Sequence, residues 1–459
     1  MRWSLTVRIV WPPTLALLVG VTLTGCQGVR SGPGAAPDSA TIVWLANTIT
    51  ETSNSPRQPL IDAFERAYPS IRVELSTLPD STDSARGALA GDLSGGSVTT
   101  GDVYLGDTIW PYQFGHDGLA LPLDRYLPAS FWSRFGTAGQ PGQYQLVSAA
   151  TYHGHIYAAP FFVDEGFLYY RKDLLALAGL RPPVTWEQLE HDAAVLKSRH
   201  LVHRFAWQGD DFEGLTAVWT EMLADAYGGL GTQPATAAQT AAELDSPQAL
   251  KALLLMRTLI SSGVTPPEVT SFEEPNTNNY FDTGQAAFQR GWSVAYETAT
   301  SPGAATAADN GANVGVLPMP TFAGQSAPGW SAIGGWDLFI NPHTRNLPAA
   351  LTFVNWMTGP QAQRILATQY GIIPANAGVR DDPAVIKVSP VLRAAAHTRL
   401  VSRPSYSTDY SQISEVIHHN VHEALVTPGM DPCLALIWAA RAIDQRVAGS
   451  LPCASSRSR

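Results

Sequence analysis

Short apolar runs alternate with amphipathic segments in the N-terminal part of the chain. The run 42–46 is continuously apolar, as expected of a buried strand, and 59–68 carries apolar residues at helical spacing. Residues 71–75 alternate as a second strand, and 102–105 form a third apolar run. Because strands separated by helices are typical of parallel sheets, the pattern predicts an α/β fold class.

The same alternation continues toward the C-terminus. Strands are predicted at 156–159 and 166–170, and the second leads into a helix at Asp173. Thr185 can cap another helix, with Gln188 three residues later as its capping-box partner. The remaining expectations are a helical stretch, a surface loop, two strands and a final helix, at 234–258, 303–315, 315–317, 338–340 and 347–357.

The first 26 residues have the layout of a secretory signal. Arg2 and Arg8 precede a short apolar stretch at 15–21, and small residues then lead to Cys26. This order resembles a bacterial lipoprotein signal, in which Cys26 becomes the lipid-carrying first residue of the mature chain. The alternative is an ordinary signal peptide with an unrelated cysteine. We therefore expect residues 1–25 to be removed and the protein to be lipid-anchored on the extracytoplasmic face of the cell membrane.

Length and composition limit the organisation and the partners. A chain of 459 residues is too long for one ordinary core and suggests two domains. Residues 26–39 are small, polar and rich in Gly and Pro, so they are predicted to be a flexible linker. The formal net charge of −10, without a basic run, argues against nucleic acid as a partner.

Two cysteines remain for the mature body when Cys26 carries lipid. An even number in an oxidising compartment predicts a disulfide between Cys433 and Cys453, with two free buried thiols as the alternative. His418 and His422 stand four residues apart, but the local sequence offers no third ligand for a metal. We therefore expect no metal and no cofactor.

Several motifs in a fixed order resemble the family 1 extracellular solute-binding proteins, the sugar-capturing components of ABC importers. They are Gly154-His155-Ile156-Tyr157-Ala158-Ala159-Pro160, Asp164, Leu168-Tyr169-Tyr170-Arg171-Lys172-Asp173, Pro183-Val184-Thr185-Trp186, Gly284-Gln285-Ala286-Ala287-Phe288, Trp292, Gly334-Gly335-Trp336 and Gly371-Ile372-Ile373-Pro374. Within the family the likeness is greatest to trehalose/maltose-binding lipoproteins. That likeness lies in Phe205-Ala206-Trp207-Gln208-Gly209, Glu213-Gly214-Leu215, Glu273-Glu274-Pro275 and Asp381-Asp382-Pro383-Ala384-Val385.

The resemblance covers nearly the whole chain after the linker and implies an α/β, two-lobed periplasmic-binding-protein-like fold (type II). It implies three inter-lobe crossings, a ligand cleft between the lobes and closure by a hinge motion. The crossings are expected near 162–164, 317–320 and 370–374. Lobe 1 would comprise 40–162 and 321–370, and lobe 2 would comprise 165–316 and 375–459.

A sugar site needs aromatic faces for the rings and polar groups for the hydroxyls. The resemblance places Trp292 and Trp336 in the cleft as stacking platforms, with Gly335 letting the ligand approach the backbone. Trp110 and Trp207 are second choices. For each tryptophan, packing in the core is the alternative.

Four charged residues are carried over from the resemblance as polar anchors: Glu51, Arg86, Asp107 and Asp164. Asp107 also follows the third predicted strand, and ligands of α/β sheets bind at strand ends. Asp164 lies among apolar residues and would need partners if it were buried. The alternatives are a salt bridge to an arginine for Asp164 and solvated surface charges for Glu51 and Arg86.

Two positions depart from the trehalose/maltose pattern. Asn376 stands where an arginine anchor is expected, and Phe162 stands where a tyrosine is expected. Both changes remove hydrogen-bonding groups, and sites built for particular hydroxyls discriminate strongly. The identity of the sugar is therefore open.

The resulting hypothesis is a monomeric binding protein without enzymatic activity. It would capture a disaccharide such as trehalose or maltose and deliver it to the subunits of an ABC permease. One alternative is a glycan sensor or adhesin without transport. Another is an exported glycosidase with a carboxylate pair such as Asp107 and Asp164, which would require a defined carboxyl separation.

Overall fold

The structure is a computed structural model that describes residues 39–48, 55–79, 81–94, 101–136, 144–228, 237–307 and 311–443. These residues belong to one unit of the chain, 36–459. The predicted signal peptide, the linker up to residue 38, and Cys453 lie outside the described residues. Lipidation of Cys26 and the disulfide therefore stay predictions. Within the described ranges, no helix is both long and apolar enough to cross a bilayer.

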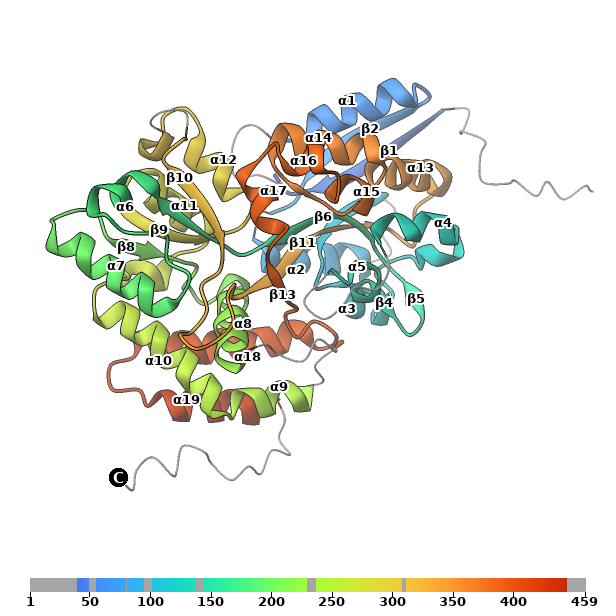
Figure 1. Cartoon of the computed structure of the whole chain (residues 1–459). Helices are drawn as coiled ribbons and strands as arrows, with labels where there is room; N and C mark the ends of the chain where they lie inside the picture. The colour runs from blue at the N-terminus through green and yellow to red at the C-terminus, as the bar shows by residue number, and fades with distance from the viewer. Residues whose placement is uncertain are drawn as a thin grey trace, which may run out of the picture. The chain divides into compact units, whose positions relative to one another are not determined.

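The larger sheet has seven strands in the order β12-β6-β11-β3-β1-β2, with β13 paired to β11 (Figure 1). The strands are β1 (Ala40–Ala46), β2 (Ile71–Thr77), β3 (Val103–Asp107), β6 (Ala159–Glu165), β11 (Trp330–Ile340), β12 (Ile373–Pro374) and β13 (Arg399–Val401). β1 pairs in parallel with β2 and β3, whereas β11 is antiparallel to β3 and β6. The parallel start predicted from the sequence is confirmed, and the later strands make the sheet mixed.

The smaller sheet has four strands in the order β10-β7-β9-β8. They are β7 (Phe167–Arg171), β8 (Arg204–Ala206), β9 (Ala286–Gly291) and β10 (Val314–Pro318); a separate ribbon pairs β4 (Thr151–Tyr152) with β5 (His155–Ile156). Only Gly166 separates β6 of the larger sheet from β7 of the smaller one. A Cβ at Gly166 would lie 1.9 Å from Glu221 Oε1, so this passage requires a glycine.

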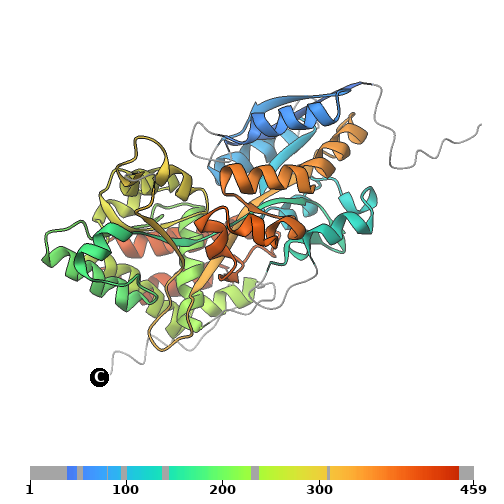
Figure 2. The ribbon, with the colours of Figure 1, turned by 45° about the horizontal axis from the view of Figure 1, so that its top comes forward.

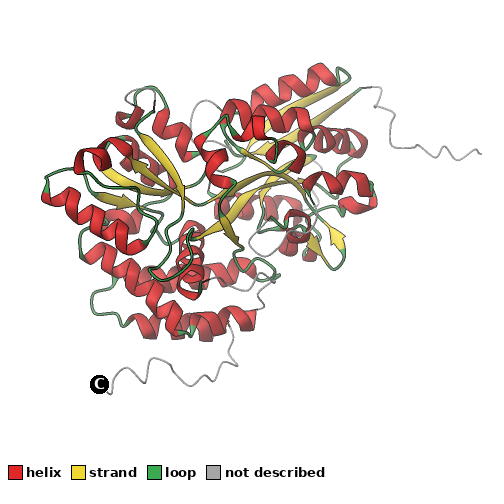
Figure 3. Cartoon of the chain, viewed as in Figure 1, coloured by secondary structure: helices red, strands yellow, loops and turns green. Residues whose placement is uncertain are grey.

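Helices cover the strands of both sheets (Figure 3). For example, α1 and α13 pack together, α1 against β2 and α13 against β1 (Figure 2). The helices are α1 (Arg57–Ala67), α2 (Thr82–Ser94), α3 (Pro111–His116), α4 (Ala129–Trp132), α5 (Leu146–Ala149), α6 (Lys172–Ala178), α7 (Trp186–Ser198), α8 (Glu213–Tyr227), α9 (Ala237–Leu244), α10 (Pro247–Ser261), α11 (Glu274–Asp282), α12 (Ala295–Thr300), α13 (Leu347–Met357), α14 (Pro360–Tyr370), α15 (Ala377–Arg380), α16 (Pro383–Ile386), α17 (Pro390–Ala395), α18 (Tyr410–Val426) and α19 (Pro432–Ile443).

The predicted helix at 347–357 matches α13, and the helical stretch predicted at 234–258 is divided into two helices in its described part. The structure has α9 and α10 there, because Ser246 caps a new helix by accepting a hydrogen bond from the Ala249 amide at 3.1 Å. Pro247 occupies the first turn of α10, where its missing N–H costs nothing.

Two smaller predictions also need correction. The strand predicted at 156–159 is divided, since β5 ends at Ile156 and β6 begins at Ala159. Thr185 caps α7 as predicted, but the Gln188 side chain accepts from the Val184 amide rather than from the Thr185 amide. The first turn of α7 is therefore capped by two reciprocal hydrogen bonds, and the one accepted by Gln188 comes from the residue before Thr185.

Candidate ligand-binding site

A cavity of about 530 Å³ lies among segments that leave both sheets. Its size falls within the range typical of small-molecule sites. The lining comprises Asn47, Thr48, Ser81, Thr82, Asp107, Asp164, Phe212, Glu213, Gly214, Ala217, Glu273, Glu274, Pro275, Asn278, Asn279, Asp282, Trp292, Val294, Thr298, Ser301, Gly334, Gly335, Trp336 and Arg403. The site is thus built from segments far apart in the sequence.

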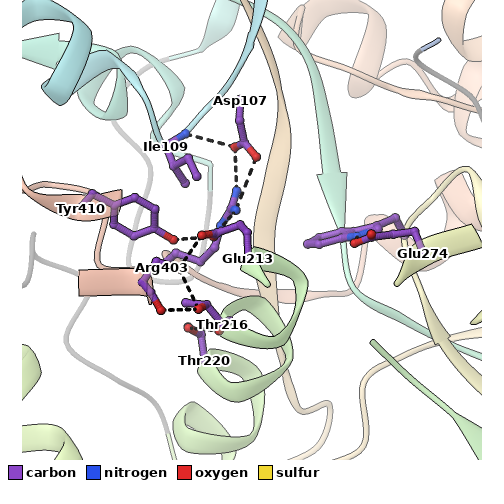
Figure 4. Close-up of polar contacts among 10 residues, drawn as sticks. Asp107, Ile109, Glu213, Thr216, Thr220, Glu274, Arg403 and Tyr410 are labelled. Atoms are coloured by element: carbon purple, nitrogen blue, oxygen red, sulfur yellow. Dashed lines mark hydrogen bonds and ion pairs between the residues drawn. The ribbon is translucent and has the colours of Figure 1, made fainter. Parts of the chain in front are cut away.

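Three lining residues, Asp107, Glu213 and Arg403, belong to a buried group that also contains Tyr410 and Ser414 behind the lining, and we call it the Arg403 network. Asp107 is the last residue of β3, and Glu213 is the first residue of α8. Arg403 Nη2 donates to Asp107 Oδ1 at 2.8 Å, and its Nη1 donates to Glu213 Oε1 at 2.7 Å. The Tyr410 hydroxyl also donates to Glu213 (Figure 4), and so does the Ser414 hydroxyl. The network therefore joins β3 of the larger sheet to the helix that begins at Glu213.

The charges of this network are almost completely removed from solvent. Arg403 is 4% exposed, and Asp107 and Glu213 are 6% and 5% exposed. Burial alone would lower the pKa of Arg403, but the charges of Asp107 and Glu213 outweigh it and raise that pKa. Burial raises the pKa of Glu213 although Arg403 opposes the shift. Breaking such a pair would leave an uncompensated buried charge.

Trp292 is held in one orientation at the cavity wall. The Arg290 guanidinium lies 3.9 Å from the centre of its ring, and its Nε1 donates to Glu274 Oε1 at 3.1 Å. Arg290 is itself fully buried and bonds to both carboxylate oxygens of Glu221. With its ring and its N–H held by protein groups, Trp292 is pre-organised to receive a ligand ring.

Trp336 and Gly335 form another part of the wall. Trp336 is half-buried, and its ring packs edge-on against Trp110 at 6.1 Å. Gly335 has φ +115°, and a Cβ there would lie 2.4 Å from the Phe162 carbonyl oxygen. Since only glycine adopts this conformation readily, the strand can pass close to β6 at the cavity.

Asp164 lies in the wall near the passage between the sheets. Its Oδ1 accepts from the backbone amides of Ser293 at 2.6 Å and Glu165 at 2.8 Å. Burial raises the pKa of Asp164 to about 6, although these hydrogen bonds oppose the shift. The amides hold the carboxyl in place, and it can form further hydrogen bonds with hydroxyl groups in the cavity.

One face of helix α11 forms another part of the cavity wall. We call its residues Glu274, Asn278 and Asp282 the α11 wall. The helix begins with a capping box between Glu273 and Asn276, which fixes where this face starts. Glu274 lies apart from the Arg403 network (Figure 4). Burial raises the pKa of Glu274, against the hydrogen bond from the Trp292 indole.

The charged residues of the described lining are predominantly acidic. They are Asp107, Asp164, Glu213, Glu273, Glu274, Asp282 and Arg403. Because the single guanidinium among them is already shared by two carboxylates, an anionic ligand would meet unbalanced negative charge. The charge of the lining therefore disfavours an anionic ligand.

Residues 48–364 match the family of bacterial extracellular solute-binding proteins. The chain belongs to this family. Membership confirms the family predicted from the sequence motifs and places the solute-binding protein outside the cytoplasm. It is 30% identical over 363 residues to a probable ABC transporter-binding protein of Deinococcus radiodurans, covering 77% of this chain and 81% of that relative.

Solved structures show the same two-lobed α/β fold. The maltose-bound MalE3 protein of T. maritima is 28% identical, with a TM-score of 0.76 over 88% of this chain and 99% of that one. A solute-binding protein of Thermotoga lettingae, solved with α-D-tagatose, is 23% identical, with a TM-score of 0.74 over 89% of this chain and 99% of that one. The second likeness concerns the fold alone.

The structure places five of the residues predicted for the solute site in the cavity lining: Asp107, Asp164, Trp292, Gly335 and Trp336. Glu51 lies outside the described residues, three positions after the lining residue Thr48 in the sequence. Arg86 lies on α2, one turn beyond Thr82, and is not among the described residues that line the cavity.

The other three predicted residues lie in the protein interior. Trp207 is fully buried, and its Nε1 donates to Thr265 Oγ1 at 3.1 Å. Trp110 is 1% exposed and supports Trp336 from behind the lining. Asn376 is 5% exposed and donates to the Thr358 carbonyl, so it fixes the chain between α14 and α15.

Sequence reasoning missed Glu213, Glu274 and Arg403 as site residues. Glu213 and Glu274 stand in stretches that resemble the trehalose/maltose-binding proteins, so a signal was present. Arg403 had no such motif and is separated from Asp107 by 296 positions.

Among the described residues, no group of three or more His, Cys, Asp or Glu side chains is arranged to hold a metal ion. His418 Nδ1 instead lies 2.6 Å from Asp211 Oδ1, and His422 Nε2 lies 3.0 Å from the Thr270 carbonyl oxygen. These histidines connect α18 to neighbouring loops.

Proposed function

We propose that the protein is a lipid-anchored solute-binding protein that captures an uncharged carbohydrate and delivers it to an ABC permease. A disaccharide such as trehalose or maltose is the proposed cargo. The protein acts as a monomer and carries out no chemical step. Cys26 is the proposed lipid attachment site, and Cys433 and Cys453 are the proposed disulfide.

The cavity is the observation that carries this proposal. Trp292 and Trp336 offer aromatic surface for sugar rings, while Asp164 and the Arg403 network offer polar groups for hydroxyls. The relation to a maltose-bound protein and to a probable ABC transporter-binding protein supports the same ligand class and the same partner.

The contacts of Asp107 favour binding over hydrolysis. A glycosidase with Asp107 and Asp164 as its carboxylate pair would need both groups available for proton transfer or attack. Asp107 is instead engaged by Arg403 at 2.8 Å. We therefore assign Asp107 to hydroxyl recognition and to holding the wall.

A thermal-shift screen tests the proposal. The purified chain is melted with trehalose, maltose, sucrose and other neutral sugars, with sugar phosphates, and with glycerophosphodiesters. A ligand that binds only the folded state raises the melting temperature, because it stabilises the folded protein by about 2.7 kcal/mol at a hundredfold excess over Kd. We expect a neutral sugar to raise it and no sugar phosphate to do so, with the sugar recovered intact by chromatography. A shift only from anionic ligands, or release of monosaccharides, would contradict the proposal.

The anchor is tested separately from the ligand. Cells expressing the chain are given a clickable palmitate analogue, and membrane and medium fractions are compared with those of a Cys26→Ala variant. We expect label on the wild-type chain and loss of both label and membrane retention in the variant. Label that persists in the variant would exclude Cys26 as the attachment site.

A further inference from the structure

One face of α19 is apolar and exposed. The helix packs against α9, α10 and α18, which lie beside it in Figure 1, and most of its apolar side chains are buried. Leu434, Trp438 and Ala442 are spaced four residues apart, so they share one face, and all three are exposed. Leu434 is 39% exposed and Trp438 is 49% exposed. Among the tryptophans in the described ranges, Trp438 is the one that is exposed, which makes this face a candidate docking surface.

The chain that follows α19 contains apolar residues that could cover this face. The helix ends at Ile443, and the sequence continues to Arg459. Leu451 and Pro452 stand in this segment directly before Cys453. Cys453 is the proposed disulfide partner of Cys433, which lies in the first turn of α19. The inference drawn below rests on that proposed bond.

The length of the segment allows it to return along the helix. With a rise of about 1.5 Å per residue, α19 covers about 15 Å from Cys433 to Ile443. The chain from Ile443 to Cys453 can span at most about 35 Å when extended. The Cα atoms of bonded cysteines lie about 5.5–6 Å apart. The segment is therefore long enough to reverse direction after α19 and reach Cys433, and Gly449-Ser450 is a sequence typical of a turn.

The disulfide also determines which residue meets Trp438. Leu451 stands two residues before Cys453, and in an extended segment this separation is about 7 Å. On a helix, about 7 Å corresponds to between four and five residues, so Leu451 comes level with Trp438 when Cys453 is level with Cys433. Because alternate residues of an extended chain point the same way, Leu451 faces α19 on the same side as Cys453.

We propose that residues 444–453 fold back along α19 and that Leu451 covers Trp438, held there by the bond between Cys433 and Cys453. The partner of this apolar face is then a segment of the same chain. Contact between the leucine and the indole removes apolar surface from water. The disulfide lowers the entropic cost of this contact because it keeps the segment beside the helix.

Peptide mapping of the secreted full-length chain under non-reducing conditions tests the covalent part. Trypsin separates the two cysteines because Arg441 and Arg446 lie between them. We expect a linked pair of peptides from a chain that migrates as a monomer on a non-reducing gel, and loss of the linkage in Cys453→Ser. Free thiols at both positions, or a bond between two copies of the chain, would overturn the proposal.

A double-mutant cycle tests the contact itself. Trp438→Ala, Leu451→Ala and the double variant are unfolded with urea. We expect the two substitutions to be coupled by at least about fivefold in the unfolding equilibrium constant, because side chains in contact do not act independently. Cys453→Ser should abolish the coupling. The matched control pairs Trp438→Ala with Leu177→Ala, at a leucine of α6 that is 68% exposed, and these two effects should be additive.

The possible outcomes separate this proposal from the carbohydrate-binding function. Additive effects of Trp438→Ala and Leu451→Ala would overturn the proposed contact even where the disulfide is found. A dimer that Trp438→Ala dissociates in sedimentation would also overturn it, because a second copy would then cover the face. Trp438 does not line the cavity, so sugar affinity should be unchanged in Leu451→Ala. A wild-type chain that binds no sugar would contradict the carbohydrate function and leave the contact unaffected.

Discussion

The Arg403 network and the α11 wall line the same cavity but handle their charges differently. In the network, Asp107 and Glu213 share one guanidinium at 2.8 and 2.7 Å, and all three side chains are almost fully buried. On the α11 wall, Asp282 Oδ1 has no partner in the described part of the chain. The first arrangement stabilises the wall before any ligand arrives, whereas the second leaves a buried carboxyl oxygen without such support.

The Arg403 network and the α11 wall differ in this way because their residues lie in different parts of the chain. The network joins β3, α8 and the segment after β13, so its ion pairs connect parts of the chain that must meet for the cavity to exist. The residues of the α11 wall lie on a single helix, whose shape does not depend on them. Substitutions in the network should therefore affect folding, and substitutions on the α11 wall should affect ligand binding.

The largest expected effect is on stability. Arg403→Ala leaves Asp107 and Glu213 as buried, uncompensated carboxylates, so we expect the free energy of unfolding to fall by about 3–5 kcal/mol. Urea unfolding monitored by circular dichroism measures this loss. The matched control is Arg364→Ala, which removes a surface pair with Asp382 whose side chains are 49% and 25% exposed. The Arg364→Ala control should lower the free energy of unfolding by less than about 1 kcal/mol. Equal losses in the two variants would contradict the view that the buried Arg403 network contributes more to stability than a surface ion pair.

The next effect concerns affinity on the α11 side. Trp292→Ala removes the ring that Glu274 and Arg290 hold in place, and we expect the affinity for the neutral sugar to fall by about 2 kcal/mol, or roughly 30-fold. Calorimetric titration measures it. Trp292→Phe keeps an aromatic face but loses the N–H that donates to Glu274, so its loss should be smaller. A larger loss for Trp292→Phe than for Trp292→Ala would argue against stacking.

A further prediction concerns the pH dependence of stability. The pKa of Asp282 is about 7 in the folded protein, above the ordinary value of 3.8. The folded state therefore binds the proton more tightly, so this carboxyl makes stability fall as the pH rises from about 4 to 7, with no further fall above 7. Asp282→Asn should flatten the unfolding free energy across that window, measured at several pH values from 4.5 to 8.

Asp337 provides the comparison for this titration. Burial and the neighbouring charge of Asp107 raise the pKa of Asp337 to about 8. By the same reasoning, Asp337→Asn should flatten the profile over a wider window, up to about pH 8. Profiles of the two variants that both coincide with wild type would show that neither carboxyl holds its proton more tightly in the folded state.

Much of the secondary structure could be predicted because local patterns determine it. The run 42–46, the alternation at 71–75 and the apolar spacing at 347–357 each correspond to an element of the structure. The division of 234–258 was missed because the apolar spacing continues past Ser246, although Ser246-Pro247 is itself a start signal for a helix. The Ala- and Leu-rich composition of 234–258 hid the boundary between α9 and α10, which is set by the capping of α10 by Ser246.

The site was predictable where a short motif carried it. Asp107 ends a recognisable strand, and Gly334-Gly335-Trp336 brings a glycine and a tryptophan together. Arg403 could not be found in this way, because its role depends on meeting two carboxylates from distant parts of the chain. Trp207 shows the converse: its sequence surroundings suggested a ligand platform, yet the fold packs it beside Thr265.

Calorimetric titration of maltose and trehalose into the wild-type chain, the Trp292→Ala variant and an Asp381→Asn control tests the central claim most directly. Asp381 is exposed and lies outside the cavity lining. We predict one bound sugar per chain, with affinity strongly reduced in Trp292→Ala and unchanged in Asp381→Asn. Binding of equal strength in all three proteins would place the sugar elsewhere and contradict the assignment of this cavity. Heat from neither sugar, together with clear binding of a sugar phosphate, would contradict the proposed ligand class.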